Sequence, residues 1–428
     1  MSKIFRRLSQ VAIGLTVAAL IPTFAQEKKT QLLFWGGTEA VDEFEQQIAR
    51  FNETHPDVEV IYESQPNLRE ILRTALAAGE GPDIVYGGTG PGAAGVLVNA
   101  GLLLPLDEAY AEYGWNDRFS DFTKERASID GTVYGIGNEI EYIGMFFNER
   151  IFAELGLSEP KTHDEVLQLC QSLQDAGLAP IAFGNQEKWP ASHIFSVFSG
   201  NLAGKEKLAA AISGEVPWND PAFVSAIATP FVEMVEAGCF NPSVNAISYD
   251  DANLLFYSGQ AAMTLTGNWM MSDYTDPEVM PDPVGFFFYP SVDGGPVVPP
   301  AGVGSAYFVS SAVENPEAAF EVLDFLFSEE ATKFWIEDVN VMPPNKQIDV
   351  SNYEIPELLK TAITTLQNEV GSMGYNLDVL TPQNFNALMF DGLQGVIGGT
   401  KSPEQLADDL QGAMEEAKAA GDVSDITQ

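Results

Sequence analysis

Two carboxylates stand two residues apart in the run Gly-Asn-Glu-Ile-Glu-Tyr over residues 137–142. In an extended backbone, alternate residues point to the same face, so Glu139 and Glu141 could act together. Such a pair could serve glycoside hydrolysis, in which one carboxyl group donates a proton and the other attacks or activates water. It could equally accept hydrogen bonds from sugar hydroxyl groups, and a chain with many acids also produces such pairs by chance. The residues alone leave these alternatives open.

Tryptophans beside glycine, proline or polar residues form a second candidate group. Trp35, Trp189 and Trp269 each stand at the edge of an expected element. A sugar presents a face of C–H bonds and a rim of hydroxyl groups, so its pocket needs flat aromatic faces with polar side chains around them. Trp189-Pro190 and Asn268-Trp269 suit that need. The same rings would suit a polyamine through cation–π contacts, and for any single tryptophan, packing in the core is the simpler explanation.

The chain offers little for metal or nucleophilic catalysis. Its three histidines, His55, His163 and His193, are far apart, and neither HExxH nor Gly-x-Ser-x-Gly occurs. The glycine cluster over residues 87–92 is not followed by Gly-Lys-Ser/Thr, so it is no phosphate-binding loop. We therefore expect no catalytic residue, no metal site and no cofactor.

The charge balance is strongly acidic, with 21 Lys and Arg against 61 Asp and Glu and a formal net charge of −40. The first 25 residues hold three of the cations and none of the acids, so the rest of the chain has 18 against 61, or −43. Phosphate binding needs clustered Lys and Arg, so we expect no nucleic-acid partner, and an anionic membrane would repel the chain. Two explanations stay open: a source in saline water, where salt screens the self-repulsion, or a periplasmic protein with an unusually acidic surface.

The N-terminus reads as an export signal. Three basic residues precede an apolar run over residues 11–21, and Thr23-Phe24-Ala25 places small residues where a signal peptidase reads them. We expect cleavage near Ala25 and a location in the periplasm. No cysteine lies near Ala25, so we expect no lipid anchor.

The two cysteines are Cys170 and Cys239. An even number of cysteines in an exported chain favours a disulfide. Two buried free thiols are the alternative, because cysteine is also a common core residue.

Strands alternate with helices near the start of the chain. Expected strands over residues 31–35, 58–62 and 83–86 enclose helices around 44–51 and 67–78. This alternation predicts right-handed βαβ units and a parallel sheet. The length exceeds the usual size of one core, so we expect two domains.

No simple linker separates two halves of the chain. The candidate boundaries lie inside strand-like runs near Gly137 and Phe287, which predicts two lobes joined by crossing strands and able to close on a ligand. The expected parts are a signal peptide (1–25), a first α/β lobe (26–138 with 287–336) and a second α/β lobe (139–286 with 337–428).

Several runs follow one another in a set order: GPDIV (81–85), AGLLLPL (100–106), DGTVYGI (130–136), FNERIF (147–152), PKTHDE (160–165), FYSGQAAM (256–263), GNW (267–269) and PEAAFEVLDFL (316–326). In this order they resemble the extracellular solute-binding proteins of family 1, the periplasmic receptors of sugar ABC importers. The resemblance implies an α/β, type II periplasmic-binding fold with two lobes, a multi-strand hinge and a ligand between the lobes. It implies a monomeric receptor, not an enzyme, that delivers a sugar or oligosaccharide to ABC permease subunits in the inner membrane.

The resemblance also implies site residues. Glu39 and Glu141 would bind sugar hydroxyl groups, Trp269 would stack on a sugar ring, and Trp189 stands where relatives place another stacking aromatic. The third-strand loop, Gly87-Gly88-Thr89-Gly90, departs from the aromatic and charged residues of relatives, which leaves the identity of the sugar open. The expected ligand-binding set is Trp35, Glu39, Thr89, Glu141, Tyr142, Trp189, Asn268 and Trp269. The alternatives are a secreted glycosidase using Glu139 and Glu141, and a receptor of the same fold for a polyamine or other cationic solute.

Overall fold

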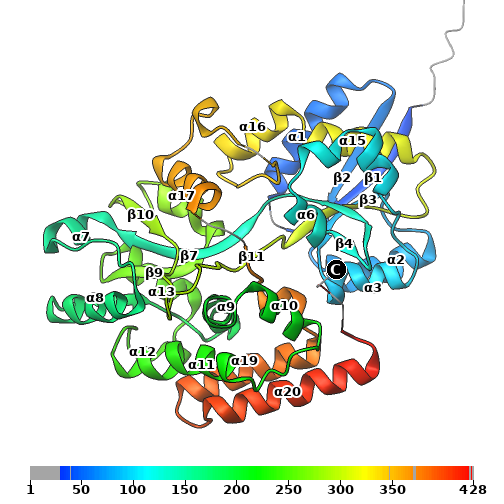
Figure 1. The fold of residues 1–428 in the computed structure, drawn as a ribbon. Helices are drawn as coiled ribbons and strands as arrows, with labels where there is room; N and C mark the ends of the chain where they lie inside the picture. The colour runs from blue at the N-terminus through cyan, green and yellow to red at the C-terminus, as the bar shows by residue number, and fades with distance from the viewer. Residues whose placement is uncertain (1–28, 39, 347, 370–372, 424–425, 427–428) are drawn as a thin grey trace, which may run out of the picture.

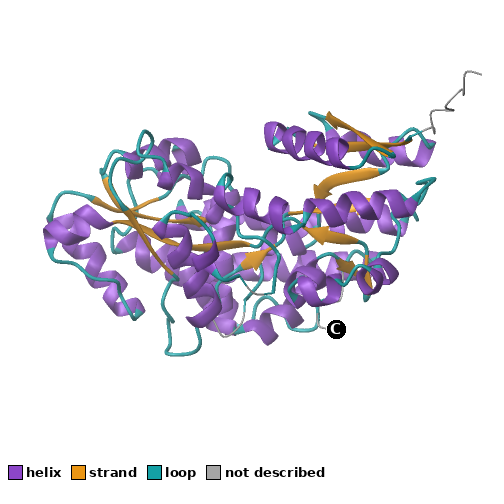
Figure 2. Cartoon of the chain, turned by 90° about the horizontal axis from the view of Figure 1, so that it is seen from above, coloured by secondary structure: helices purple, strands orange, loops and turns teal. Residues whose placement is uncertain are grey.

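The computed structural model describes residues 29–38, 40–346, 348–369, 373–423 and 426. Two α/β bodies lie side by side, and one long strand, β7 (Glu141–Asn148), runs from the junction into the second body (Figure 1). In the view from above, the strands of each body lie among helices (Figure 2). The expected signal peptide lies outside the described residues.

A five-stranded sheet, in the order β2-β1-β3-β12-β6, is the centre of the first lobe. β1 pairs in parallel with β2 and β3, as the alternating pattern predicted, whereas β12 is antiparallel to both β3 and β6. The strands are β1 (Thr30–Gly36), β2 (Val58–Ser64), β3 (Ile84–Gly88), β6 (Gly135–Gly137) and β12 (Ser305–Val309), with a small hairpin of β4 (Ser128–Ile129) and β5 (Thr132–Val133) beside them.

Both faces of the first sheet carry apolar residues that helices cover. Successive residues of a strand point to opposite faces, so Phe34 packs with Phe44 and Trp335 on one face, while Trp35 packs with Leu76 on the other. The helices of this lobe are α1 (Val41–Thr54), α2 (Leu68–Ala78), η1 (Pro91–Gly95), α3 (Val96–Asn99), α4 (Asp107–Glu112), α5 (Trp115–Arg118), α6 (Asp121–Arg126), α15 (Pro316–Leu326) and α16 (Glu329–Glu337).

The second lobe is built on the sheet β10-β7-β9-β8, with β11 also paired to β7. β7 is antiparallel to β9, β10 and β11, and β8 is parallel to β9. These strands are β8 (Ala179–Ala182), β9 (Ala261–Gly267), β10 (Val284–Phe287) and β11 (Ala301–Gly302). The helices after β7 are α7 (Glu149–Leu155), α8 (His163–Asp175), α9 (Trp189–Ala203), α10 (Lys205–Ile212), α11 (Pro221–Ala228), η2 (Thr229–Glu233), α12 (Met234–Glu236), η3 (Val244–Ala246), α13 (Tyr249–Tyr257), η4 (Asn268–Met270), α14 (Met271–Thr275), η5 (Val350–Asn352), α17 (Glu357–Glu369), α18 (Leu377–Leu380), α19 (Gln383–Ile397) and α20 (Pro403–Ala420).

Helix α9 is a part of the second lobe that the sequence did not predict. Its residues from Pro190 to Asn201 are all buried. A helix that is buried all round has no polar face and therefore no amphipathic period. Because an amphipathic period is the signal that identifies a helix in a sequence, the sequence of this stretch did not indicate a helix.

The chain changes lobes within short segments. β6 belongs to the first sheet and β7, which starts only at Glu141, belongs to the second. Later in the chain, β11 still pairs with β7 of the second sheet, whereas β12 begins at Ser305 in the first sheet. We call this second change of lobe the return crossing. We propose that the lobes exchange at residues 138–140 and again at 303–304, so that residues 287–302 belong with the second lobe rather than, as expected from the sequence, with the first.

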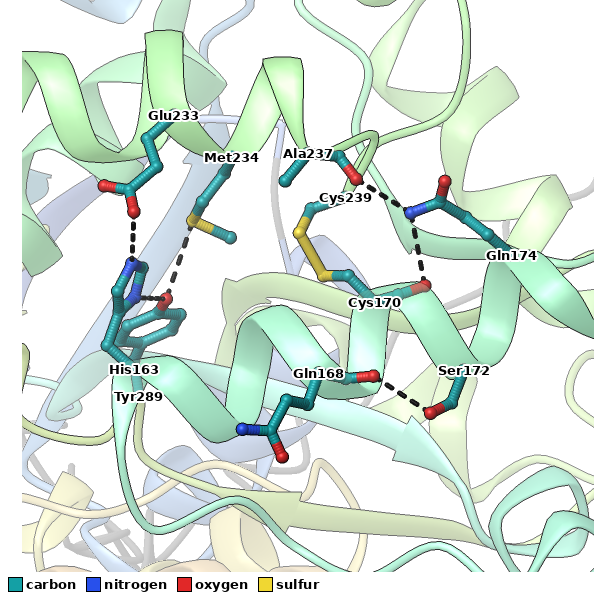
Figure 3. The surroundings of a disulfide bond; sticks show 10 residues. All are labelled: His163, Gln168, Cys170, Ser172, Gln174, Glu233, Met234, Ala237, Cys239 and Tyr289. Carbon is teal, nitrogen blue, oxygen red and sulfur yellow. Dashed lines mark hydrogen bonds and ion pairs between the residues drawn. A yellow bond between two sulfur atoms is a disulfide. The ribbon is translucent and has the colours of Figure 1, made fainter.

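A disulfide joins Cys170 of α8 to Cys239, which follows α12, across a sequence separation of 69 and a Cα–Cα distance of 5.1 Å (Figure 3). Both cysteines belong to the main core of the second lobe. The Nε2 of Gln174 donates to the carbonyl groups of Ala237 and Cys170, so hydrogen bonds also join the two segments that the disulfide connects.

Removing this disulfide should lower the stability of the protein strongly. Closing a loop of about 70 residues in the unfolded chain is worth roughly 4 kcal/mol in the chain-entropy account. We expect the double variant Cys170→Ser/Cys239→Ser to lose about that much in urea denaturation. A thiol assay on the denatured, unreduced wild type should find no free thiol; two free thiols would contradict the bond.

Candidate functional site

Four rings of the second lobe contact one another, and we call them the aromatic cluster: Trp189 and His193 from α9, Tyr249 from α13 and Trp269 from η4. Their centroids are 4.6 Å apart for Trp189 and Tyr249, 5.0 Å for Trp189 and His193, and 5.3 Å for His193 and Trp269. The two indoles lie 6.2 Å apart at an interplanar angle of 65°. They therefore form a corner rather than a stack.

Local structure explains how the rings are presented. Trp189 and His193 are four residues apart on one helix and so share a face. The indole of Trp269 lies against the backbone of Gly267, where any Cβ atom would clash with the ring. Trp269 is 37% exposed, so part of this residue remains accessible to a ligand.

A hydrogen-bond chain fixes the orientation of two of these rings. Nε1 of Trp269 donates to the Tyr249 hydroxyl at 3.0 Å, and that hydroxyl lies 2.7 Å from Oγ1 of Thr266. Burial raises the pKa of Tyr249, so its hydroxyl stays protonated. It accepts from Trp269, and in the pair with Thr266 either hydroxyl group can be the donor.

Polar groups line one side of the aromatic cluster. Nε2 of His193 lies 3.2 Å from a carboxylate oxygen of Asp378 and 3.3 Å from the amide nitrogen of Asn376. The backbone N–H of Leu377 donates to Oγ of Ser196 at 3.1 Å, which ties this segment to α9. Aromatic faces beside carboxylate, amide and imidazole groups can bind either a polyhydroxylated ring or an organic cation.

Two expected site residues meet at the return crossing between the lobes. The carboxylate of Glu141 lies against Gly304, so closely that a Cβ there would clash with it. The Thr89 hydroxyl donates to the carbonyl of Val303, and its backbone N–H donates to that of Gly304 at 3.1 Å. Thr89 is buried, so its side chain contributes to the crossing rather than to an open surface.

Three other expected residues lie inside the lobes. Trp35 is buried in the first-lobe core and donates to Glu63 at 2.9 Å. The Tyr142 ring is fully buried in the second lobe, where burial raises its pKa. Asn268 accepts from the backbone N–H of Tyr142 at 2.8 Å and donates to the carbonyl of Ile140 at 3.2 Å. The three side chains are buried, and the contacts of Trp35 and Asn268 lie inside the protein, while Glu39 lies outside the described residues.

The carboxylate pair does not sit on a regular strand. Glu139 lies in the irregular segment between β6 and β7, and Glu141 is the first residue of β7.

The described part of the chain contains no group of three or more His, Cys, Asp or Glu side chains that could hold a metal ion. Within that same part, no helix has both the length and the apolar character needed to cross a bilayer.

The sequence did not single out His193, Tyr249, Asn376 or Asp378 as site residues. His193 carried a usable signal, because it follows Trp189 by one helical turn. Tyr249 and Asp378 join the cluster only through tertiary contacts with residues far away in the sequence.

Comparison with known proteins places the chain among binding proteins. The family model of the bacterial extracellular solute-binding proteins matches residues 36–333. An uncharacterised ABC transporter extracellular-binding protein of Pyrococcus horikoshii is 25% identical over 371 residues, covering 81% of this chain and 80% of that protein. The galactooligosaccharide-binding protein of Bacillus subtilis is 24% identical over 348 residues, which is 79% of each chain.

Solved structures share the architecture. A chitin oligosaccharide binding protein superposes with a TM-score of 0.79 at 24% identity, covering 91% of this chain and 99% of the other. The maltose/maltodextrin-binding domain of Bdellovibrio bacteriovorus, bound to maltotriose, gives a TM-score of 0.69 at 21% identity, with 91% and 100% covered. The predicted two-lobed, type II periplasmic-binding fold is confirmed.

Replacing Asn268 should destabilise the protein, because its two bonds satisfy buried backbone groups. Asn268→Ala leaves the Tyr142 N–H and the Ile140 carbonyl without this partner, and we expect a loss of about 1–3 kcal/mol in urea denaturation. Asn268→Asp keeps the acceptor for Tyr142 and should lose less. Equal stability of the alanine variant and the wild type would contradict the structural role.

Proposed function

Because this chain belongs to the bacterial extracellular solute-binding protein family, we propose that it captures a sugar or oligosaccharide between its lobes and delivers it to an ABC-type importer. The observation that carries the ligand class is the exposed face of Trp269, set at a corner with Trp189 beside the His193–Asp378 pair. A sugar needs this combination of an apolar face and a polar rim. The oligosaccharide ligands named for several relatives support the same class.

In this proposal the two indoles stack on the sugar and Asp378 accepts hydrogen bonds from its hydroxyl groups. Glu141, at the crossing, and Glu39 accept others, and the Thr89 loop bounds the cleft on the first-lobe side. Trp35, Tyr142 and Asn268 support these groups from within the lobes.

The proposed setting is the periplasm, after cleavage near Ala25 and without a lipid anchor, and the working form is a monomer that docks on the permease subunits. The disulfide between Cys170 and Cys239 supports an oxidising compartment. The family consists of extracellular binding proteins, which agrees with a receptor rather than an enzyme.

One competing cargo has a specific observation in its favour. The aromatic cluster and the Asp378 carboxylate together resemble the surroundings that an organic cation prefers, and the strong negative charge would attract a polyamine.

The first experiment follows tryptophan fluorescence and melting temperature of the mature protein with mono-, di- and trisaccharides, glycosides and polyamines at moderate salt. A saturable signal with one group of sugars supports the proposal and identifies the cargo class. A response to polyamines alone would replace the sugar by a cation. Turnover of a chromogenic glycoside would instead favour the glycosidase that uses Glu139 and Glu141.

Removing the exposed indole should weaken binding without unfolding the protein. Taking the stacking of a nucleobase on an aromatic ring, about 1–3 kcal/mol, as a guide, Trp269→Ala should raise the dissociation constant of the ligand found above about ten- to hundredfold. Leu254→Ala, at a leucine that is 59% exposed, is a control that should bind like the wild type. An unchanged dissociation constant in Trp269→Ala would remove this residue from the site.

A further inference from the structure

The segment from Gly374 to Val379 belongs to the second lobe but contacts the first lobe at two places. Its second-lobe attachment is firm, because Gly374 donates to the carbonyl of Pro299 at 2.8 Å, and Tyr375 and Leu377 are buried in the second-lobe core. We call residues 374–379 the junction segment.

The first contact is made by Arg126 at the end of α6 in the first lobe. Its guanidinium lies 4.3 Å from the ring centroid of Tyr375 and 4.8 Å from that of Phe122, and it donates to the carbonyl of Gly374 at 3.5 Å. Its side chain is only 4% exposed, and its Nε has no hydrogen-bond partner. Cation–π contacts and the ion pair with Glu125, at 3.3 Å, offset the cost of removing this charge from water.

This contact is suited to being reversible. Separating the lobes would break the cation–π contact with Tyr375 but would also return the guanidinium to water. Because the gain and the cost of burying a charge nearly cancel, such a contact can hold two surfaces together without making their separation prohibitive.

The second contact is made by Gly90 at the end of the third-strand loop. A Cβ on Gly90 would lie 2.6 Å from the carbonyl oxygen of Val379, so the two backbones meet directly. Helix α18 also packs against η1, which follows Gly90. The backbone of Gly90, at φ 80° and ψ 174°, is in a region that glycine alone adopts readily.

Between these two contacts, the junction segment reaches the aromatic cluster. Asn376 and Asp378 both lie within hydrogen-bond distance of His193, and the His193 ring contacts both indoles. One short stretch of chain therefore touches the first lobe at each end and the site in its middle.

We propose that the junction segment is the closure contact of this receptor, and that Gly90 and Arg126 are positioning residues that set ligand affinity without touching the ligand. Only the second half of the proposal, the effect on affinity, rests on the proposed function, because the contact between the lobes is argued from the geometry of Arg126, Gly90 and the junction segment. A ligand bound to the aromatic cluster would retain Asp378 in place, and the closed arrangement would in turn slow its release.

Gly90→Ala tests the contact, and Gly204→Ala is a matched control. Gly204 has nearly the same backbone, φ 78° and ψ 163°, but a Cβ there meets no atom within 4 Å. Both variants carry the same backbone strain, and only the first adds a clash between the lobes. Small-angle X-ray scattering without ligand should show a larger radius of gyration for Gly90→Ala than for the wild type. The radius of gyration of Gly204→Ala should equal that of the wild type. Equal radii in the two variants would overturn the closure contact.

Binding kinetics test the link to affinity, with the sugar that the fluorescence panel identifies. We expect dissociation from Gly90→Ala to be about tenfold faster, and dissociation from Gly204→Ala to match the wild type. If no sugar binds the wild type, the proposed function fails while the scattering result still decides the contact. Equal dissociation rates in the two variants, with binding intact, would overturn the role in affinity.

A second pair of variants examines Arg126 through its partner ring. Tyr375→Leu keeps an apolar side chain in the core but removes the π face, and it should expand the protein and speed dissociation in the same direction as Gly90→Ala. Tyr375→Phe keeps the ring and loses only the interaction of its hydroxyl with the guanidinium, so it should stay closer to the wild type than the leucine variant. If the leucine and phenylalanine variants, checked for intact melting, have equal radii and equal dissociation rates, the guanidinium contact has no role in closure.

Discussion

Asn268 links two parts of the chain. One is the start of β7 at the lobe junction, and the other is Trp269, the more exposed of the two tryptophans in the aromatic cluster. Its side chain binds both the Tyr142 N–H at the start of β7 and the Ile140 carbonyl in the crossing segment. The next residue is Trp269, whose indole rests on Gly267 and is held by Tyr249. Geometry at the crossing and geometry at the site are therefore not independent, since one amide fixes both.

Glycine is what permits this density of contacts at the junction. Gly267 gives room to the Trp269 indole, Gly304 to the Glu141 carboxylate and Gly90 to the Val379 carbonyl. Each is a place where a functional group approaches a backbone closer than a Cβ would allow. In the third-strand loop this explains Gly90, because the carbonyl oxygen of Val379 in the second lobe occupies the place that a Cβ would need.

The sequence predicted the parts of this fold that depend on local pattern. Alternating strands and helices indicated the parallel pairing of β1 with β2 and β3. Trp269 was predicted as a site residue from its position after a strand, and its role stays a prediction. Trp35 and Tyr142 show the limit of that reasoning. Both stand near strand ends, but alternation directs Trp35 into a covered face of the first sheet and Tyr142 into the second-lobe core, which a sequence cannot reveal without knowing what covers each face. His193 and Asp378 meet only because α9 and α18 pack together.

The acidity of the chain opposes closure of the lobes, and the contact of the buried Arg126 acts against it. With 61 acids against 21 bases in the whole sequence, two lobes that approach each other bring like charges together, and this repulsion opposes closure. Salt reduces such repulsion between exposed charges, but it screens a buried guanidinium between Phe122 and Tyr375 much less. The long-range charge thus favours an open receptor at low ionic strength, and a short-range, desolvated contact opposes it. A receptor governed by this balance can close on a ligand and still reopen, because neither term needs to be large.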